Sequence, residues 1–426
     1  MKKSSIPLGA RREFLTGAGA MVVASSLGLV PRVQAGPNAP VVGSKPSDVA
    51  VIGAGAFGAW TALSLLERGA KVTMIDAYGP GNPRATSSGV SRLIRYGYGD
   101  QEIYTRWAVE AMGIWKSREK EWGAKLLFPG TRLLMAERWD HSLDAQRHIF
   151  DRLHLPYEIA KHDELRHRYP QIGFEGIESA FVEPDAAMIK AQSAILKIAE
   201  VFARKGGVNQ IGQARPGSAS GRRLQALNLD DGGKVSADSF VFACGPWLRK
   251  LFPELLGTKM ATPRCEVAFF GQPAGDKRFS WPNFPYVNDG MSTYPVLDGG
   301  GFKVVIPVGG SNVDPDEQQR VPTAGHVKRA RDWLAVRVPA MKDQPIVDYR
   351  VCQFEMTADE HFIIDKHPDY DNVWLAGGGS AHGYKHGPVI GNYVAGRVCG
   401  EAGDPELQRI FALAGRKDAN ADALPM

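Results

Sequence analysis

Short apolar runs alternate with stretches of helical spacing along the first part of the chain. Residues 48–52 (DVAVI) and 71–75 (KVTMI) are apolar runs bounded by polar residues, which is typical of buried parallel strands. The stretch between them, residues 59–68, has helical character and ends at Gly69. This strand–helix–strand order predicts an α/β domain built on a parallel sheet.

Further elements follow the same pattern. Residues 190–203 predict a helix, residues 208–211 a strand, and residues 238–244 a buried strand that stops before Gly245-Pro246. Strand-like pieces also occur at 266–270 and 302–308. The order of these elements predicts a second part of the fold in addition to the first strand–helix–strand unit.

The N-terminus has a different apolar pattern. A basic start leads into RREFL at residues 11–15, a weakly apolar run at 17–30 and Val-Gln-Ala at 33–35. This order resembles a twin-arginine signal peptide over residues 1–35, so we expect export by the twin-arginine (Tat) machinery to the periplasm or outside the cell. Residues 36–47 predict a linker rich in proline and glycine. The apolar run is shorter than the ~20 residues of a membrane span, so no stable span is expected in the mature chain.

Composition and charge exclude several classes of protein. The chain has 426 residues, 44% hydrophobic and 23% charged, which indicates folded domains with buried cores. Residues 1–35 contain five basic residues and one acidic residue, so they account for most of the formal net charge of +5. A nucleic-acid-binding surface is therefore not indicated. The four cysteines offer neither a disulfide framework nor a metal site; they are Cys244, Cys265, Cys352 and Cys399.

The first chemical motif directly follows the first predicted strand. Gly53, Gly55 and Gly58 form a GxGxxG pattern, and Asp76 stands 23 residues after Gly53 at the end of the second strand. The glycines permit a tight turn, close approach of a pyrophosphate and packing of the helix on the sheet. Asp76 is placed to hold ribose hydroxyls and disfavours the 2′-phosphate of NADP. The motif predicts dinucleotide binding, with NAD and FAD both open.

Small polar residues and two arginines follow this motif. Ser87 and Ser88 are suited to wrap around a cofactor, and Arg92 and Arg95 would share one face of a helical turn. Spacing alone fits a solvated basic face equally well. The position of these residues just after the dinucleotide motif favours a place in the site.

Three segments resemble the monomeric sarcosine oxidase group of flavoprotein amine oxidases. Residues 87–99 (SSGVSRLIRYGYG) are similar to the group's pattern SSHGxxRxIRxxYG. Residues 352–365 (CQFEMTADEHFIID) are similar to C-x-Y-x-x-T-x-D-x-H-F-I-I-D, and residues 377–385 (GGGSAHGYK) to GFSGHGFK. The resemblance spans residues 48 to about 399.

The resemblance implies a D-amino acid oxidase-like fold, α/β in its first domain and α+β overall. A Rossmann-like FAD-binding domain is discontinuous, and a second domain carries an antiparallel sheet over the flavin and binds the substrate. The implied ranges are 48–115, 184–250 and 350–400 for the FAD-binding domain, 116–183 and 251–349 for the substrate domain, and 401–426 for a C-terminal tail.

The resemblance also implies roles for single residues. Cys352 would be joined through sulfur to the 8-methyl carbon of the flavin, and Lys303 would lie against flavin N5 and promote reaction with O2. Arg95 and Lys385 would hold the substrate carboxylate, and Arg92 would lie over the ring system.

The last motif adds cofactor-binding residues. Lys385 would also lie near the N1–C2 carbonyl region of the flavin, and backbone N–H groups of Ser380, His382 and Gly383 would help to stabilise negative charge there. No metal is implied.

The chain departs from the group's pattern in its substrate pocket. Ser88 stands where the group has an active-site histidine, Phe354 replaces a tyrosine, and Pro307 replaces a second histidine. Ser292 or Tyr294 corresponds to a pocket tyrosine. Because the flavin-holding residues persist while the pocket differs, we expect a substrate other than sarcosine.

The sequence thus predicts FAD-dependent oxidation of a secondary amine or of an amino acid, N-methylated or not, to an imine, with O2 reduced to H2O2. Two alternatives remain open. One is an exported flavin dehydrogenase that passes electrons to a quinone or carrier protein. The other is an exported flavin-binding protein without catalysis.

Overall fold

The computed structural model describes residues 48–419. The predicted signal peptide at 1–35, the linker at 36–47 and the last residues of the tail, 420–426, lie outside the described residues. The strands are β1 Asp48–Ile52, β2 Lys71–Asp76, β3 Ser91–Ile94, β4 Leu127–Ala136, β5 Glu158–Lys161, β6 Ser179–Lys190, β7 Val208–Ile211, β8 Ala214–Pro216, β9 Ala219–Ser220, β10 Arg223–Leu224, β11 Ala226–Leu229, β12 Lys234–Ser236, β13 Ser239–Phe242, β14 Pro263–Phe270, β15 Tyr286–Asp289, β16 Met291–Tyr294, β17 Phe302–Asn312, β18 Ile346–Gln353, β19 Ile363–Lys366 and β20 Val373–Gly377. The α-helices are α1 Ala56–Glu67, α2 Glu102–Trp122, α3 His141–Arg152, α4 His162–Arg168, α5 Ala191–Arg204, α6 Leu248–Leu251, α7 Pro253–Leu256, α8 Ala324–Arg337, α9 Gly387–Val398 and α10 Pro405–Phe411.

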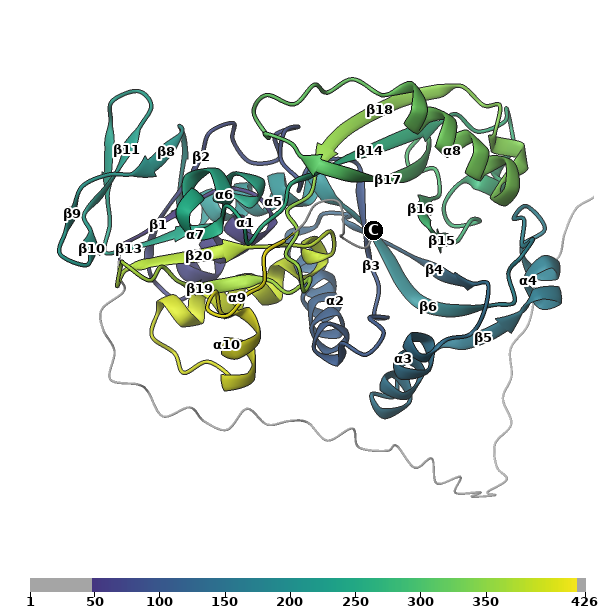
Figure 1. Cartoon of the computed structure of the whole chain (residues 1–426), viewed down its shortest axis with the longest axis horizontal. Helices are drawn as coiled ribbons and strands as arrows, with labels where there is room; N and C mark the ends of the chain where they lie inside the picture. The colour runs from purple at the N-terminus through teal and green to yellow at the C-terminus, as the bar shows by residue number, and fades with distance from the viewer. Residues whose placement is uncertain (1–47, 420–426) are drawn as a thin grey trace, which may run out of the picture. The chain divides into compact units, whose positions relative to one another are not determined.

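The first sheet has the strand order β19-β20-β13-β1-β2-β7 (Figure 1). All its neighbouring strands are parallel except β19, which runs antiparallel to β20. The predicted strands at 48–52 and 71–75 are therefore confirmed. The carboxyl ends of β1, β2 and β13 come together at one edge, where open α/β sheets bind their ligands.

Side chains of β1 pack on both faces of this sheet, which explains its unbroken apolar sequence. Val49 and Val51 lie in the core formed with helices α1, α5 and α9. Ala50 and Ile52 face the other way, into a core shared with β11 and the short helices α6 and α7. All four residues are at most 4% exposed. A strand buried on both sides has no position for a polar side chain.

The second sheet has the order β18-β14-β17-β16-β15-β4-β6-β3, and β5 also pairs with β6. Its neighbours are antiparallel except for β15 and β4, which are parallel. The predicted mixed architecture, a Rossmann-like sheet with a second, mainly antiparallel one, is confirmed. The predicted domain boundaries at 183/184 and 349/350 fall inside β6 and β18, both of which lie in the second sheet. The domain ranges stay a prediction.

The expectation of a helical turn at Arg92 and Arg95 is wrong. Residues Ser91–Ile94 form β3, which pairs with β6 in a register that places Arg92 opposite Ile189. β-Branched and apolar neighbours at 93 and 94 favour a strand, and pairing with the long strand β6 satisfies its backbone. The two arginines therefore reach the site from a strand and from the residue that follows it.

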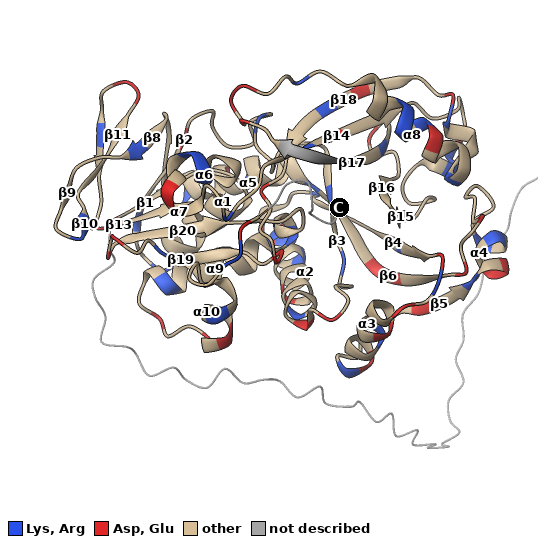
Figure 2. Cartoon of the chain, viewed as in Figure 1, with Lys and Arg blue, Asp and Glu red and all other residues tan. Residues whose placement is uncertain are grey.

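The C-terminal segment packs on the first domain. Phe411 of α10 is fully buried, with its ring centroid 5.1 Å from that of Trp107 and 5.7 Å from that of Phe362. Helices α2, α3 and α8 each carry charges of both signs (Figure 2). Within residues 48–419, no helix is long and apolar enough to cross a membrane. The same residues contain no group of three or more His, Cys, Asp or Glu side chains placed to hold a metal ion.

Candidate functional site

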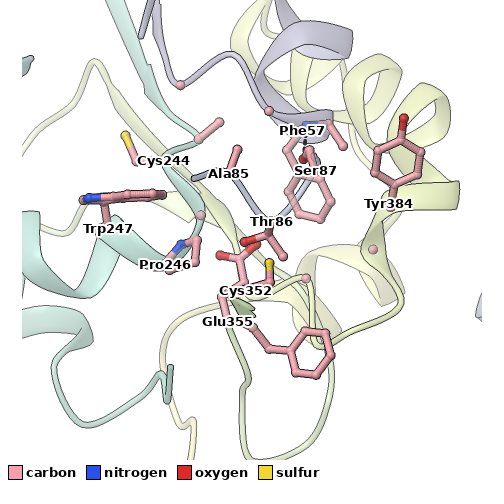
Figure 3. Close-up of a pocket in the computed structure, with 18 of the residues that line it drawn as sticks. Phe57, Ala85, Thr86, Ser87, Cys244, Pro246, Trp247, Cys352, Glu355 and Tyr384 are labelled. Carbon is pink, nitrogen blue, oxygen red and sulfur yellow. Dashed lines mark hydrogen bonds between the residues drawn. The ribbon is translucent and has the colours of Figure 1, made fainter. Parts of the chain in front are cut away.

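A cavity of about 360 Å³ lies between the carboxyl edge of the first sheet and one face of the second. Its lining includes the predicted cofactor residues Gly53, Gly55, Asp76, Ser87, Arg92, Lys303, Cys352 and Gly383. Figure 3 shows Cys352 and Glu355 pointing into this cavity, across from Thr86 and Ser87. The fold therefore brings together residues that are up to 330 positions apart, from Gly53 to Gly383.

The turn that contains Gly53, Gly55 and Gly58 is packed too closely for side chains at two of its glycines. A Cβ atom on Gly53, which has a φ of +103°, would lie 2.3 Å from the carbonyl oxygen of Ala243. A Cβ atom on Gly58 would lie 1.8 Å from the carbonyl oxygen of Gly53. Gly58 does not line the cavity, but it lets α1 begin directly against the turn. This is the third role that the sequence motif predicted.

Asp76 lies at the end of β2 and holds the same turn. Its Oδ2 accepts a hydrogen bond from the backbone N–H of Ala54 at 2.8 Å, and its Oδ1 accepts one from Tyr78 at 2.9 Å. Burial raises the pKa of Asp76, and these backbone hydrogen bonds oppose that rise. The carboxylate lines the cavity, which is consistent with the predicted contact to ribose hydroxyls.

The loop after β2 supplies polar groups to the cavity. Ser87 Oγ accepts a hydrogen bond from the N–H of Ala56 at 2.8 Å, so its own hydrogen is left to donate. Thr86 Oγ1 and Ser88 Oγ are buried and have no hydrogen-bond partner among the described residues. Arg92 holds the loop in place by donating to the carbonyl oxygens of Thr86 and Ser88, the latter at 2.7 Å. Buried polar atoms without partners normally have one in the working protein.

These observations fit a bound FAD. The glycine turn allows close approach of a pyrophosphate, the Asp76 carboxylate lines the cavity where it could hold a ribose, and Thr86 offers a hydroxyl with unused hydrogen-bonding capacity. Ser88 Oγ also lacks a partner among the described residues, but Ser88 does not line the cavity. The cavity also has the apolar wall that a flavin ring requires, since Val267, Val305 and Phe354 contribute to its lining.

Lys303 enters the cavity from β17. It is 4% exposed, its Nζ donates to the carbonyl oxygen of Ser91 at 2.7 Å, and it lies 4.0 Å from the centroid of the Tyr294 ring. Burial and the charge of Arg92 lower the pKa of Lys303 well below 10.5. The backbone pairing of β17 with both β14 and β16 fixes this side chain in the wall. Lys303 thus lines the cavity, and its implied position against flavin N5 stays a prediction.

Cys352 lies on β18, and Cys265 lies directly opposite it on β14. Both thiols line the cavity. Cys352 is partly exposed, whereas burial, followed by the charge of Cys352, raises the pKa of the Cys265 thiol. Because a thiolate is the reactive form, this raised pKa disfavours reaction at Cys265.

The predicted role of the backbone N–H groups of Ser380, His382 and Gly383 needs a correction. The N–H of Ser380 donates to the carbonyl oxygen of Glu355, and those of His382 and Gly383 donate to Gly379. These groups are used in closing the loop, so they are not available to a ligand. Ser380 and Ala381 both have positive φ values, 42° and 59°, a backbone strain that clusters at functional sites.

A second, smaller cavity of about 220 Å³ adjoins the first and shares Arg92, Ser292, Tyr294 and Tyr384 with it. Arg95, His382 and Lys385 lie here rather than in the larger cavity.

Two of these side chains are cations held by neutral groups. Lys385 Nζ donates to Tyr98 Oη at 2.9 Å and to the carbonyl oxygen of His382 at 3.1 Å. Arg95 donates to the carbonyl oxygen of Gly97 and lies 4.3 Å from the centroid of the Tyr98 ring. Burial, followed by the charges of Arg95 and Arg132, lowers the pKa of Lys385. Within the described chain neither Arg95 nor Lys385 has a carboxylate within 4.0 Å.

Sequence reasoning missed two residues that line these cavities, Glu355 and Arg132, and one that holds Lys385, Tyr98. Glu355 stands inside a recognised motif but was not given a role, and Tyr98 lies only three residues after Arg95. Arg132 lines the second cavity from β4, which no motif marks. For Glu355 and Tyr98, their place within a motif was a usable signal. For Arg132 there was none, since only the pairing of distant strands brings it to the site.

The buried carboxyl group of Glu355 should make the free energy of unfolding of the protein depend on pH. Burial raises its pKa to about 7 from 4.5, against hydrogen bonds from the backbone of Gly379 and Gly378. Between those values the folded protein binds a proton that the unfolded chain does not, so stability falls as pH rises through this range. Glu355→Gln removes the effect and, above pH 7, stabilises the protein by up to about 3 kcal/mol, since one pKa unit is ~1.4 kcal/mol. Urea unfolding at pH 5 and pH 8 measures it, and identical pH slopes in both proteins would refute the assignment.

The fold and the cavity define a flavin-dependent oxidoreductase, and comparison with known proteins agrees. The family model described as FAD dependent oxidoreductase (DAO) matches residues 48–397, and the chain belongs to this family. FAD is therefore its cofactor.

Individual relatives show which flavin-dependent oxidoreductases the chain is similar to. The chain is 28% identical to the human peroxisomal sarcosine oxidase over 360 residues, covering 81% of this chain and 90% of the relative. It is 26% identical to a monomeric sarcosine oxidase of Bacillus sp. (strain B-0618), with 82% and 91% covered. A modified fructosyl peptide oxidase from Aspergillus nidulans shares its fold, with a TM-score of 0.78 at 17% identity over 90% of this chain and 96% of the other.

Proposed function

We propose that this protein oxidises the C–N bond of a secondary amine or N-substituted amino acid to an imine, with O2 as the electron acceptor. The observation that carries the proposal is that the cofactor cavity adjoins the smaller cavity, which contains Arg95 and Lys385. These cations have no carboxylate partner of their own, so a substrate carboxylate supplies one. The similarity to sarcosine oxidases supports the same substrate class.

The chain's own residues bind and orient the substrate. The guanidinium of Arg95 and the ammonium of Lys385 fix the carboxylate, which leaves the amine end directed at the shared wall of Ser292 and Tyr294. Bound FAD accepts the two electrons and the hydrogen that leave the substrate carbon, and the imine is then hydrolysed by water.

The electrostatics of the small cavity favour the reactive form of the substrate. Nearby positive charges disfavour protonation of the amine, and the neutral amine is the form that can lose a hydride. Burial and the charge of Lys385 also hold the pKa of His382 and His386 well below 6.5, so both imidazoles are neutral at pH 7. The binding site therefore has fixed cations that hold the carboxylate and disfavour protonation of the nitrogen, and its imidazoles add no further charge.

Turnover assays test this function. N-Methyl amino acids are expected to give H2O2 and a carbonyl product in equal amounts, and the corresponding amines without a carboxylate are expected to react weakly. If neither group gives product while the protein retains its flavin, the proposed reaction is wrong. Product without peroxide, in the presence of an added quinone, would instead indicate the dehydrogenase alternative.

We also propose that Cys352 holds the flavin covalently. Its thiol lines the cofactor cavity and is partly exposed there. Denatured wild-type protein is then expected to keep flavin fluorescence on the polypeptide, and Cys352→Ser is expected to release all of it. Cys265→Ser is the matched control, because that thiol faces Cys352 in the same cavity and should not affect the attachment. Free flavin from denatured wild-type protein would overturn the proposal.

Export by the twin-arginine route remains a proposal based on residues 1–35. Changing Arg11 and Arg12 to lysine is expected to keep folded, flavin-containing protein in the cytoplasm, since the route requires both arginines. The wild type is expected in the periplasm with Gly36 as its first residue. Cell fractionation measures both. Unchanged export of the double variant would contradict this route.

A further inference from the structure

The smaller cavity contains more positive charge than one carboxylate can balance. Among the residues that line it are four cations, and its described lining includes no Asp or Glu side chain. Arg92 is already occupied by the carbonyl oxygens of Thr86, Ser88 and Ser91. Arg95, Lys385 and Arg132 remain. The first two were assigned above to a substrate carboxylate.

Arg132 is almost fully buried at 4% exposure, yet it faces this cavity. It lies on β4 directly opposite Glu183 of β6, next to an irregularity in the pairing of the two strands between Gly130 and Arg132. Such bulges re-aim a side chain and occur next to active sites. Arg132 Nη1 donates to Glu183, and Nε donates to Asn288 Oδ1 at 2.7 Å. No described residue accepts a hydrogen bond from Nη2.

The Glu183 carboxylate binds groups of the protein itself and does not face the smaller cavity. The Glu183 carboxylate is 1% exposed and accepts hydrogen bonds from the backbone N–H groups of Tyr96 at 2.8 Å and Gly97 at 3.2 Å. It does not line the cavity. Glu183 compensates one of the four positive charges, so the smaller cavity keeps an excess of about three before a substrate enters, of which the Arg92 charge is directed at backbone carbonyl oxygens.

Asn288 holds Arg132 in a fixed direction. Its amide oxygen accepts from Arg132, and its amide nitrogen donates to Ser292 Oγ at 2.6 Å. Ser292 is opposite Asn288 on β16 and belongs to the walls of both cavities. A chain of hydrogen bonds therefore connects Glu183, Arg132 and Asn288 to Ser292 in the wall of the cofactor cavity. A guanidinium held in this way is preorganised to bind a carboxylate.

We propose that Arg132 is a substrate-binding residue that recognises a second carboxylate, so that the preferred substrate is an N-substituted amino acid with two carboxylates. This inference rests on the proposed function, in which Arg95 and Lys385 bind the first carboxylate. The second one is carried on the side chain or on the nitrogen substituent. Two carboxylates are compatible with the excess positive charge of the smaller cavity.

Binding to the holoprotein tests the site without catalysis. Glutarate is compared with its monoamide, 4-carbamoylbutanoate, which has nearly the same shape and one charge less. Calorimetry or perturbation of the flavin spectrum is expected to show glutarate binding about 10- to 100-fold more tightly, because hydrogen bonds between charged groups are stronger than neutral ones. Equal affinities in the wild type would overturn the inference.

Variants separate substrate binding from a purely structural ion pair. Arg132→Gln alone leaves Glu183 buried without its partner, so the double variant Arg132→Gln/Glu183→Gln is used to remove both charges together. This double variant is expected to bind glutarate and its monoamide equally. The matched control Glu183→Gln keeps the cation and is expected to keep the preference. A preference for glutarate that survives in the double variant would overturn the role of Arg132.

A second experiment distinguishes a failure of this inference from a failure of the proposed function. The holoprotein is mixed anaerobically with N-methylglutamate, N-methylglutamine and N-methylglycine, and flavin bleaching is recorded. Faster bleaching at low concentration by N-methylglutamate supports the inference. Equal bleaching by N-methylglutamate and N-methylglutamine overturns it and leaves the proposed function intact. If none of the three bleaches the flavin while glutarate still binds through Arg132, the dicarboxylate site stands and the proposed function fails.

Discussion

Replacing Gly58 by alanine is expected to remove most of the flavin from the protein. The new Cβ would lie 1.8 Å from the carbonyl oxygen of Gly53 and 2.9 Å from its carbon, both of them backbone atoms that cannot rotate away. Either α1 moves off the sheet or the turn opens, and both changes displace the backbone that approaches the pyrophosphate. Overpacking of this kind costs about 3 kcal/mol, so affinity for FAD should fall about 10²-fold. Flavin per polypeptide, with circular dichroism to confirm folding, measures the effect.

The same substitution elsewhere provides the control. Gly113 lies within helix α2 and has nothing within 4 Å of the position that a Cβ would take. Gly113→Ala should keep full flavin content and gain about 0.5–1 kcal/mol of stability, because alanine is the better helix former. Normal flavin content in Gly58→Ala would show that the turn does not hold the cofactor.

The second large effect is expected from Lys303→Met, which keeps length and apolar volume but removes a buried charge. If the ammonium promotes the reaction with O2, reoxidation of the flavin should slow by about 10²–10³, the usual loss for one preorganised charge. Anaerobic reduction by substrate should change much less. Stopped-flow measurement of the two half-reactions separates them. Equal slowing of both would place Lys303 in substrate binding, and unchanged reoxidation would favour the dehydrogenase alternative.

The pH dependence of reoxidation adds an independent readout. Burial and the charge of Arg92 lower the pKa of Lys303 well below 10.5, and only the protonated form carries the charge. Reoxidation of the wild type should therefore slow as pH rises through this lowered pKa, and Lys303→Met should lack that step. Lys366→Met is the control, because Lys366 also lies over an aromatic ring, 5.2 Å from the centroid of Trp374, but is exposed on β19 outside both cavities.

Much of the first domain could be predicted because its signals are local. The apolar strand at 48–52, the glycines at 53, 55 and 58, and Asp76 follow one another within 30 residues. Each is required by the chemistry of a turn, a phosphate or a ribose. The resemblance added Cys352 and Lys303, which lie more than 200 residues further along, and the structure brings both to the same cavity.

What could not be predicted depends on strand pairing and on loop closure. Arg132 reaches the second cavity only because β4 pairs with β6 and β15, an arrangement that no sequence period encodes. The N–H groups at Ser380, His382 and Gly383 were expected to face a ligand, but hydrogen bonds within the loop use them. The spacing of Arg92 and Arg95 predicts a helical turn, whereas Arg92 lies in the four-residue strand β3, which is too short to show alternation.

We propose that this flavoprotein takes a hydride from an N-substituted amino acid bound by Arg95 and Lys385. Anaerobic mixing of the purified yellow protein with a panel of N-methyl amino acids and simple amines measures this step. The visible flavin absorbance is expected to be lost with the carboxylate-bearing amines, and the colour is expected to return when air is admitted. Retention of the oxidised spectrum with every member of the panel would contradict it.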